Sequence, residues 1–182
     1  MNAYCTKKGC KKPTPDLPKP APSKVEVVQA QAVGKDTGTP FSYALTTPLV
    51  QLKQVNLRTG QCIDNIQLLL SDGIKSTFTP QYGGQGGGPH TWAVPAGEQL
   101  SQVEYWNGKD TLSGFILITN KGTKSPLFGT NGGTYTLVTF PSGYRVIGIH
   151  GKQGKFAYNF GFTLGKTIYP NGVDAEVDIK NI

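Results

Sequence analysis

The stretch Gly34-Lys-Asp-Thr-Gly38-Thr-Pro-Phe41 has two echoes later in the chain, Gly83-Gly-Gln-Gly-Gly-Gly-Pro89 and Gly129-Thr-Asn-Gly-Gly-Thr-Tyr135. Each precedes an apolar segment, and the three recur every 45 to 50 residues. The period is counted from Gly38, Gly88 and Gly133. Self-similarity at such a period is typical of repeated structural units. The repeat indicates three sheets around a pseudo-threefold axis, while three unrelated glycine turns are the simpler alternative.

The segments around these stretches have the character of β-strands. They are short, rich in Val, Ile, Leu, Phe, Tyr and Thr, and bounded by turn residues such as Asn107-Gly108. No window shows a convincing helical period, so the sequence predicts an all-β protein, either a sandwich or a closed prism. A first strand begins near Val25, and the others are expected at 41–45, 49–57, 62–70, 90–94, 100–107, 112–119, 134–140, 144–150 and 156–164.

Composition and charge exclude several classes of protein. The 182 residues include 24 Gly and 13 Pro, and only 16% are charged, which does not suit a coiled coil. The formal charge of +7 is uneven, because residues 1–24 hold six Lys and one Asp and leave only +2 for residues 25–182. A nucleic-acid partner is therefore not expected, since phosphate binding needs cations clustered on the folded part. The apolar runs are too short for a membrane span.

Three regions follow from these patterns. Residues 1–24 are a Pro/Lys-rich tail, 25–164 are the β-domain, and 165–182 are a C-terminal extension. Within the extension, Val173-Asp-Ala-Glu-Val-Asp-Ile179 alternates and could add an edge strand or join subunits of a homo-oligomer. The tail has no apolar leader, which favours the cytoplasm or release by another route. Cys5 and Cys10 could close a small loop, but their spacing is a poor zinc signal.

One short motif, Gly60-Gln61-Cys62-Ile63-Asp64, has the residues for ligand binding. A tight glycine turn can direct successive N–H groups outward, and the carboxylate of Asp64 can accept hydrogen bonds from two adjacent hydroxyls. Sugar hydroxyls both donate and accept, so this set suits a saccharide. The glycine stretches lack the GxxxxGK[ST] and GxGxxG patterns of phosphate-binding loops. The simpler interpretation of the motif is a turn glycine and an aspartate that bonds its own loop.

Several ordered segments between Val25 and Leu164 carry a resemblance to a known family. They are Gly38-Thr-Pro-Phe41, Ile63-Asp-Asn-Ile-Gln67, Tyr82-Gly-Gly-Gln-Gly-Gly87, Gly97-Glu-Gln-Leu100, Ile118-Thr-Asn-Lys-Gly122, Phe128-Gly129, Gly132-Gly-Thr134, Val146-Ile-Gly-Ile-His-Gly151 and Gly154-Lys-Phe-Ala-Tyr-Asn-Phe-Gly161. In these segments the chain resembles the jacalin-related lectins, especially the mannose-binding type. The resemblance implies a β-prism of three four-stranded Greek-key sheets. It also implies sugar sites at one end of the prism, each pairing a GxxxD turn with a glycine-rich loop, with no metal or cofactor.

The family's main site departs from its pattern here. The matching turn is Gly154-Lys155-Phe156-Ala157-Tyr158, so Tyr158 replaces the aspartate, and its partner loop ends at Gly38. Asn159 follows one position late and should point to the opposite face of the strand. We regard Gly38 and residues 154–158 as a secondary, degenerate sugar site, in which Tyr158 either stacks on a ligand or leaves the site inactive.

A second family site is better kept and is the primary candidate. It comprises Gly60, Gln61, Cys62, Ile63 and Asp64 together with Gly83, Gly84 and Gln85 of the matching loop. By the resemblance, Asp64 would accept from two sugar hydroxyls. The N–H groups of residues 61–63, with one from Gly83 or Gly84, would bind further oxygens. No third site is expected beside Gly132-Gly133, because Asn107-Gly108-Lys109-Asp110 lacks the spacing.

The sequence thus predicts a metal-independent lectin for mannose- or glucose-containing glycans, and two alternatives remain. One is a module for sulfated or other anionic glycans, bound through Lys152, Lys155 and the tail. The other is a prism kept for assembly without a sugar ligand. An enzyme is not expected, because His90 and His150 lie in no catalytic motif. The tryptophans, Trp92 and Trp106, are interpreted as packing residues rather than sugar platforms.

Overall fold

The computed structural model describes residue 21 and residues 24–170. These residues form fourteen β-strands and no helix. The all-β prediction is therefore confirmed. The predictions for Cys5 and Cys10, for most of the basic tail and for the alternating segment Val173–Ile179 lie outside the described residues.

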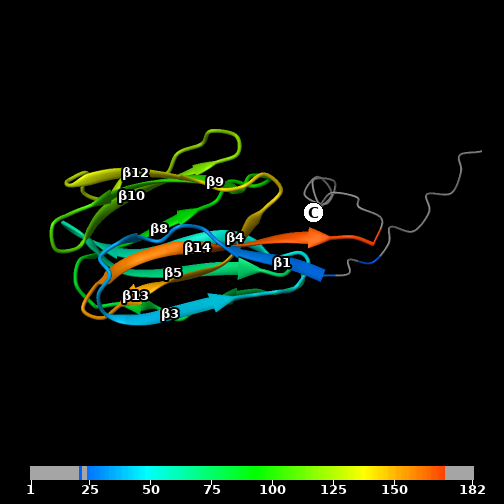
Figure 1. Ribbon diagram of the computed structural model, residues 1–182, viewed down its shortest axis with the longest axis horizontal. Helices are drawn as coiled ribbons and strands as arrows, with labels where there is room; N and C mark the ends of the chain where they lie inside the picture. The colour runs from blue at the N-terminus through cyan, green and yellow to red at the C-terminus, as the bar shows by residue number, and fades with distance from the viewer. Residues whose placement is uncertain (1–20, 22–23, 171–182) are drawn as a thin grey trace, which may run out of the picture.

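The strands form three antiparallel sheets around a common core (Figure 1). The first sheet has, in spatial order, β1 (Lys24–Gln29), β14 (Ala157–Ile168), β13 (Arg145–Gln153) and β3 (Thr39–Ala44), with β2 (Val33–Gly34) also beside β14. The second has β6 (Ser76–Phe78), β5 (Ile63–Ser71), β4 (Gln51–Thr59) and β8 (Gly88–Ala93), with β7 (Tyr82–Gly83) also beside β5. The third has β11 (Phe128–Gly129), β10 (Leu112–Thr119), β9 (Leu100–Asn107) and β12 (Thr134–Thr139).

One outer strand of each sheet is interrupted. β1 and β2 both pair with β14, and β6 and β7 both pair with β5. In the third sheet a bridge between Ile118 and Lys124 precedes the pairing of β11 with β10. If the two short strands of an interrupted edge are counted as one, each described sheet has four strands, as the resemblance implied. β2, β6, β7 and β11 were not expected as strands, because two or three residues are too few to show alternation.

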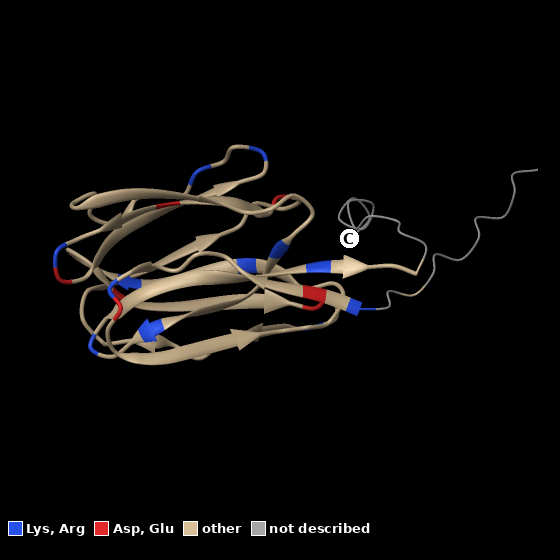
Figure 2. Ribbon diagram, in the orientation of Figure 1, with Lys and Arg blue, Asp and Glu red and all other residues tan. Residues whose placement is uncertain are grey.

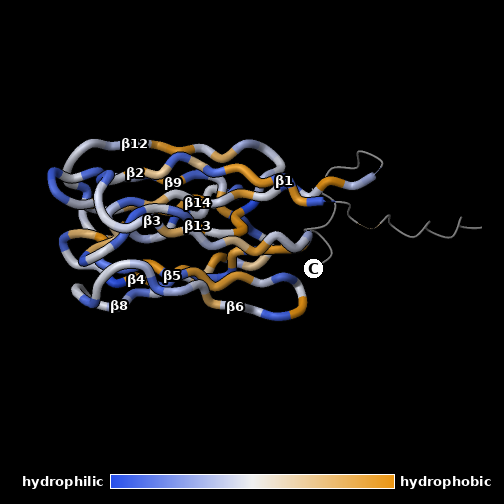
Figure 3. Tube along the Cα trace, turned by 60° about the horizontal axis from the view of Figure 1, so that its bottom comes forward, coloured by the Kyte–Doolittle hydropathy of each residue, from blue (hydrophilic) through white to orange (hydrophobic). Residues whose placement is uncertain are grey.

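Side chains from the three sheets meet in one hydrophobic core. Phe160 of the first sheet contacts Tyr105 and Phe115 of the third, with ring centroids 5.3 and 4.9 Å apart. The second sheet adds fully buried residues such as Ile66 and Leu68. Burial of one such side chain is worth roughly 1.5–3 kcal/mol. Hydrophobic residues follow the strands and hydrophilic residues gather in the turns at the ends (Figure 3).

The two ends of the prism differ. Lys24 of β1 pairs with Ile168 of β14, so the described chain enters and leaves at the same end. The loops between β2 and β3 and between β7 and β8, with the β13–β14 turn, lie at the opposite end (Figure 1). The ten longer strands match the predicted segments to within four residues at each end, and β14 runs on to Ile168.

Candidate functional site

A hairpin turn and a glycine-rich loop meet three times at one end of the prism. In each sheet the loop residue after the first glycine donates its backbone N–H to the carbonyl of one strand residue. The donor–acceptor pairs are Lys35 to Tyr158 at 2.9 Å, Gly84 to Asp64 at 2.8 Å, and Thr130 to Ser113 at 2.9 Å. Asp64, Tyr158 and Ser113 therefore hold equivalent positions in the three sheets.

The glycine loops are themselves equivalent in backbone shape. Each begins and ends with a glycine of positive φ, four residues apart, where other residues would be strained. These glycines are Gly34 and Gly38, Gly83 and Gly87, and Gly129 and Gly133. The period counted from Gly88 is therefore shifted by one residue, because Gly87 is the equivalent of Gly38 and Gly133. This shared shape supports the repeat over three unrelated turns.

At the second sheet the carboxylate of Asp64 lies directly against the glycine loop. A Cβ atom on Gly86 would stand 2.4 Å from Oδ1 of Asp64, and one on Gly87 would stand 2.6 Å from Oδ2. Any side chain at either position would displace the carboxylate. The structure thus brings Asp64 together with residues 83–87, as the sequence led us to expect.

Neighbouring side chains fix the loop over Asp64. Arg58 donates from Nε to the carbonyls of Gln85 at 3.1 Å and Gly86 at 2.9 Å, and from its terminal nitrogen to Gly87 at 2.8 Å. Asn65 donates to the carbonyl of Gly84 at 3.1 Å. The role of Arg58 was missed from the sequence, because its loop partners lie 27 to 29 residues away.

The surroundings of Asp64 shift its pKa. The residue is only 6% exposed, and burial raises the pKa of the carboxyl group, while the positive charge of Arg58 lowers it. Cys62, half-buried in the same turn, has its thiol pKa raised by burial and by Asp64, with a hydrogen bond to Thr111 acting the other way. Arg58 thus only partly compensates a carboxylate that the loop covers.

The backbone donors at this site differ from the expected set. Gly83 donates its N–H to Oε1 of Gln153 at 2.9 Å, and Gly84 donates to Asp64, so neither is free for a ligand. The expected donor from this pair is therefore already bonded within the protein. Within the described chain, no acceptor is found for the N–H groups of Gln61 and Cys62. Gln61 is exposed and Cys62 half-exposed, so these two amides remain as candidate donors.

At the first sheet an aromatic ring takes the place of the carboxylate. The ring of Tyr158 lies over Gly38, whose Cβ would be 2.8 Å from the ring, and beside Gly154 at 3.1 Å. Phe156 packs edge-on against Tyr158 with centroids 5.9 Å apart, and Lys155 lies 5.6 Å from the Phe156 centroid. The Tyr158 ring thus occupies the position that the Asp64 carboxylate holds in the second sheet.

Asn159 does not substitute for the missing aspartate. It is 8% exposed and donates to the carbonyl of Lys35 at 2.7 Å, as Asn65 does to Gly84 in the second sheet. In the third sheet Ser113 stands at the aspartate position, 9% exposed, and a Cβ on Gly108 would lie 2.1 Å from its hydroxyl. Among the three equivalent positions, only that of the second sheet carries a carboxylate.

Other candidate chemistries find little support in the described residues. No group of three or more His, Cys, Asp and Glu side chains there could hold a metal ion. His150 has a ring nitrogen 2.9 Å from the carbonyl of Ala30, and His90 packs 6.3 Å from the ring of Phe128. Trp92 packs against the core and Trp106 against Tyr135. The described part of the chain contains no apolar helix of membrane-spanning length.

Comparison with known proteins adds independent findings. A family model described as the jacalin-like lectin domain matches residues 30–163. No curated protein sequence matches the chain.

Solved structures share the fold at low sequence identity. AcmJRL, a mannose-binding jacalin-related lectin from Ananas comosus, is 23% identical with a TM-score of 0.65, over 76% of this chain and 96% of its own. Malaysian banana lectin is 23% identical with a TM-score of 0.64, over 76% and 98% of the two chains. Artocarpin, a lectin with mannose specificity, is 16% identical with a TM-score of 0.67, over 78% and 98%.

Proposed function

Because the chain belongs to the jacalin-like lectin family, we propose that it binds mannose- or glucose-type sugars through the turn Gly60–Asp64 and the loop Gly83–Gly87. The observation that carries the proposal is the contact between the Asp64 carboxylate and Gly86 and Gly87. The mannose-binding relatives named above support the class of ligand.

Recognition would proceed by replacing the water around a sugar with fixed groups of the protein. The exposed part of the Asp64 carboxylate would accept hydrogen bonds from two vicinal hydroxyls, and charge-assisted bonds of this kind are the stronger ones. The N–H groups of Gln61 and Cys62 would donate to ring or exocyclic oxygens. Gly83, Gly84 and Gln85 would shape the rim rather than donate. No step of this recognition requires a metal ion or a catalytic group.

The turn that carries Tyr158 is proposed to contribute little to sugar binding. Its ring already occupies the place against Gly38 and Gly154 that a ligand and a carboxylate would share. We therefore expect one sugar site of this kind per chain. A shallow single site of millimolar affinity is worth roughly −4 kcal/mol, so useful avidity would need oligomers or polyvalent glycans.

The experiment that tests this function compares three variants on a glycan array. Asp64→Ala should abolish binding at this turn, because no other side chain of the turn or its loop is placed to accept from the hydroxyls. Tyr158→Ala should leave it intact. Asp110→Ala is the matched control, since Asp110 is an exposed aspartate in the equivalent turn of the third sheet. Full binding by Asp64→Ala together with loss in Tyr158→Ala would place the site at the other sheet.

Anionic glycans are the rival class, and the structure weakens one part of that case. Lys152 forms an ion pair with Asp36, so its charge is already compensated. Binding carried by free lysines would fall steeply with salt, whereas binding through Asp64 would change little. Retention on heparin resin at increasing salt separates the two.

A further inference from the structure

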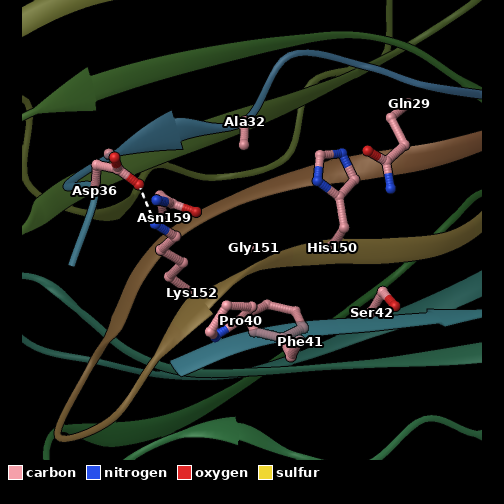
Figure 4. A pocket seen from close by; sticks show the side chains of 11 residues that line it. Gln29, Ala32, Asp36, Pro40, Phe41, Ser42, His150, Gly151, Lys152 and Asn159 are labelled. Carbon is pink, nitrogen blue, oxygen red and sulfur yellow. Dashed lines mark hydrogen bonds and ion pairs between the residues drawn. The ribbon is translucent and has the colours of Figure 1, made fainter. Parts of the chain in front are cut away.

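A hollow lies on the outer face of the first sheet, apart from the Asp64 turn and bordered by Gly34 and Asp36 of the first glycine loop. It has a volume of about 590 Å³, within the range of small-molecule sites. Its floor is β13 at Gly151 (Figure 4), where a Cβ atom would stand 2.1 Å from the backbone carbonyl of Asn159 on β14, so that only glycine fits between the two strands. The segment that contains Gln29 and Ala32 forms one wall, and β3 from Pro40 to Ser42 forms the other.

Polar side chains stand at both ends of this groove. At one end Lys152 and Asp36 form an ion pair beside Asn159. At the other end His150 and Gln29 lie next to each other, with Ser42 opposite (Figure 4). Gln29, Asp36 and Ser42 are exposed, so their hydrogen-bonding groups are within reach of a ligand. Gly151 lies between the two ends (Figure 4).

The groove carries no net charge. The charges of Lys152 and Asp36 cancel, and burial lowers the pKa of His150, which keeps the ring neutral at pH 7, although the Ala30 carbonyl acts the other way. Because Nε2 of His150 lies 2.9 Å from that carbonyl, Nε2 bears the proton and Nδ1 is an acceptor. The ring's second nitrogen points into the open middle of the groove (Figure 4).

The β3 wall supplies a fixed apolar surface. Phe41 stacks on Tyr82 of the second sheet, with ring centroids 3.9 Å apart and planes 13° from parallel. Phe41 packs against the core in this way and anchors β3, and the exposed Pro40 is the apolar side chain at the lower edge of the groove. A flat apolar edge beside alternating donors and acceptors suits a molecule with one apolar face and a rim of hydroxyls.

We propose that this groove binds a neutral saccharide of one or two rings, independently of the Asp64 turn. Lys152 and Gln29 would donate to hydroxyl oxygens, while Asp36 and Nδ1 of His150 would accept from hydroxyls. One sugar face would pack on the exposed ring of Pro40. The balanced charge disfavours a uronic acid or a sulfated sugar, which would need a free cation.

The test uses the full chain with Asp64→Asn, which removes the charge of the proposed first site. Titration with maltose is followed by the amide NMR signals of Ser42 and Gly151. We expect saturable shifts of both at millimolar sugar. Adding Ser42→Trp, which fills the groove from an exposed position, should abolish the shifts, read at Gly151 and at the amide of residue 42. Ala44→Trp, two residues further along the same exposed strand face, is the matched control and should preserve them.

Two results would overturn the proposal. One is the absence of saturable shifts at Ser42 and Gly151 while the Asp64→Asn protein keeps its native spectrum. The other is tighter, salt-sensitive binding of glucuronate than of maltose, which would mean that the groove selects an anion. Because the experiment is done without the Asp64 charge, failure of the first site does not affect it, and failure here leaves that site untouched.

Discussion

Asp64 is a carboxylate that the fold keeps beneath a glycine loop at some energetic cost. It is 6% exposed, and its raised pKa shows that burial outweighs the attraction of Arg58. Gly86 and Gly87 permit the close contact, because only a hydrogen atom fits between their Cα atoms and the carboxylate. A buried, imperfectly compensated acid is typical of a functional group rather than of a stabilising one.

The raised pKa of Asp64 predicts acid-sensitive sugar binding. The ionised form accepts hydrogen bonds best, so affinity should fall as the pH drops through the folded-state pKa. That midpoint should lie above the usual aspartate value of about 3.9, because burial favours the protonated form. Calorimetric affinities for methyl α-mannoside across the acid range would check this. An affinity that is unchanged down to the usual aspartate value would contradict the assignment.

Gly86→Ala should impair binding without a backbone conflict. Gly86 does not have a positive φ, but the new Cβ would overlap Oδ1 of Asp64 and push the carboxylate aside. We expect a loss of affinity of about tenfold or more, equal to about one charge-assisted hydrogen bond. Gly132→Ala is the control at the equivalent loop position, where the nearest atom is 3.9 Å away. Equal effects of the two variants would speak against a specific role for the Asp64 contact.

At the scale of elements, the unit of this protein is a hairpin turn with its own glycine loop, used three times. Alternation predicted the longer strands, and the repeated glycines indicated three sheets with unrelated turns as the alternative. The family resemblance, and not the periodicity, placed Tyr158 at an aspartate position. The bonds that order each loop were not predictable. Arg58 reaches carbonyls of its loop through space, and no local pattern marks an arginine for that role.

Tyr158→Asp should convert the first sheet into a second sugar site. The substitution removes the ring from Gly38 and Gly154 and restores the Gly-x-x-x-Asp spacing, while Lys35 still bonds the carbonyl of residue 158. Calorimetry with methyl α-mannoside should show one more binding site per chain than in the unmodified protein. Tyr158→Asn is the control without the charge. An unchanged stoichiometry for a folded Tyr158→Asp protein would refute the equivalence of the two turns.

At the scale of the whole molecule, each hairpin or strand end supports the loop of a neighbouring sheet. Gln153 accepts from Gly83 at 2.9 Å, Thr130 donates to Gln61 at 3.1 Å, and Asn107 donates to Gly34 at 3.3 Å. These partners lie 69 to 73 residues apart, so they follow from closure of the prism and not from local sequence. Charged residues cluster at this loop end and again at the far end (Figure 2).

The far end is proposed to stabilise the fold without touching sugar. Arg145 is 8% exposed and donates to the carbonyls of Val50, at 2.6 Å, and Pro48. Arg145→Ala would remove the donor to the carbonyl of the buried Val50, while the Pro48 carbonyl still accepts from Thr167, and should lower the free energy of unfolding by about 2 kcal/mol. Lys53→Ala, an exposed change nearby, should shift it by less than about 0.5 kcal/mol. Urea unfolding measures both, and a weaker sugar affinity in folded Arg145→Ala protein would mean that the two ends are coupled.

The most direct measurement of the central claim is an NMR titration of the unmodified chain with methyl α-mannoside. The account predicts saturable shifts of the amides of Gln61, Cys62 and Gly86 that share one dissociation constant and disappear in Asp64→Asn. Sugar binding that leaves these three amides unchanged would contradict it.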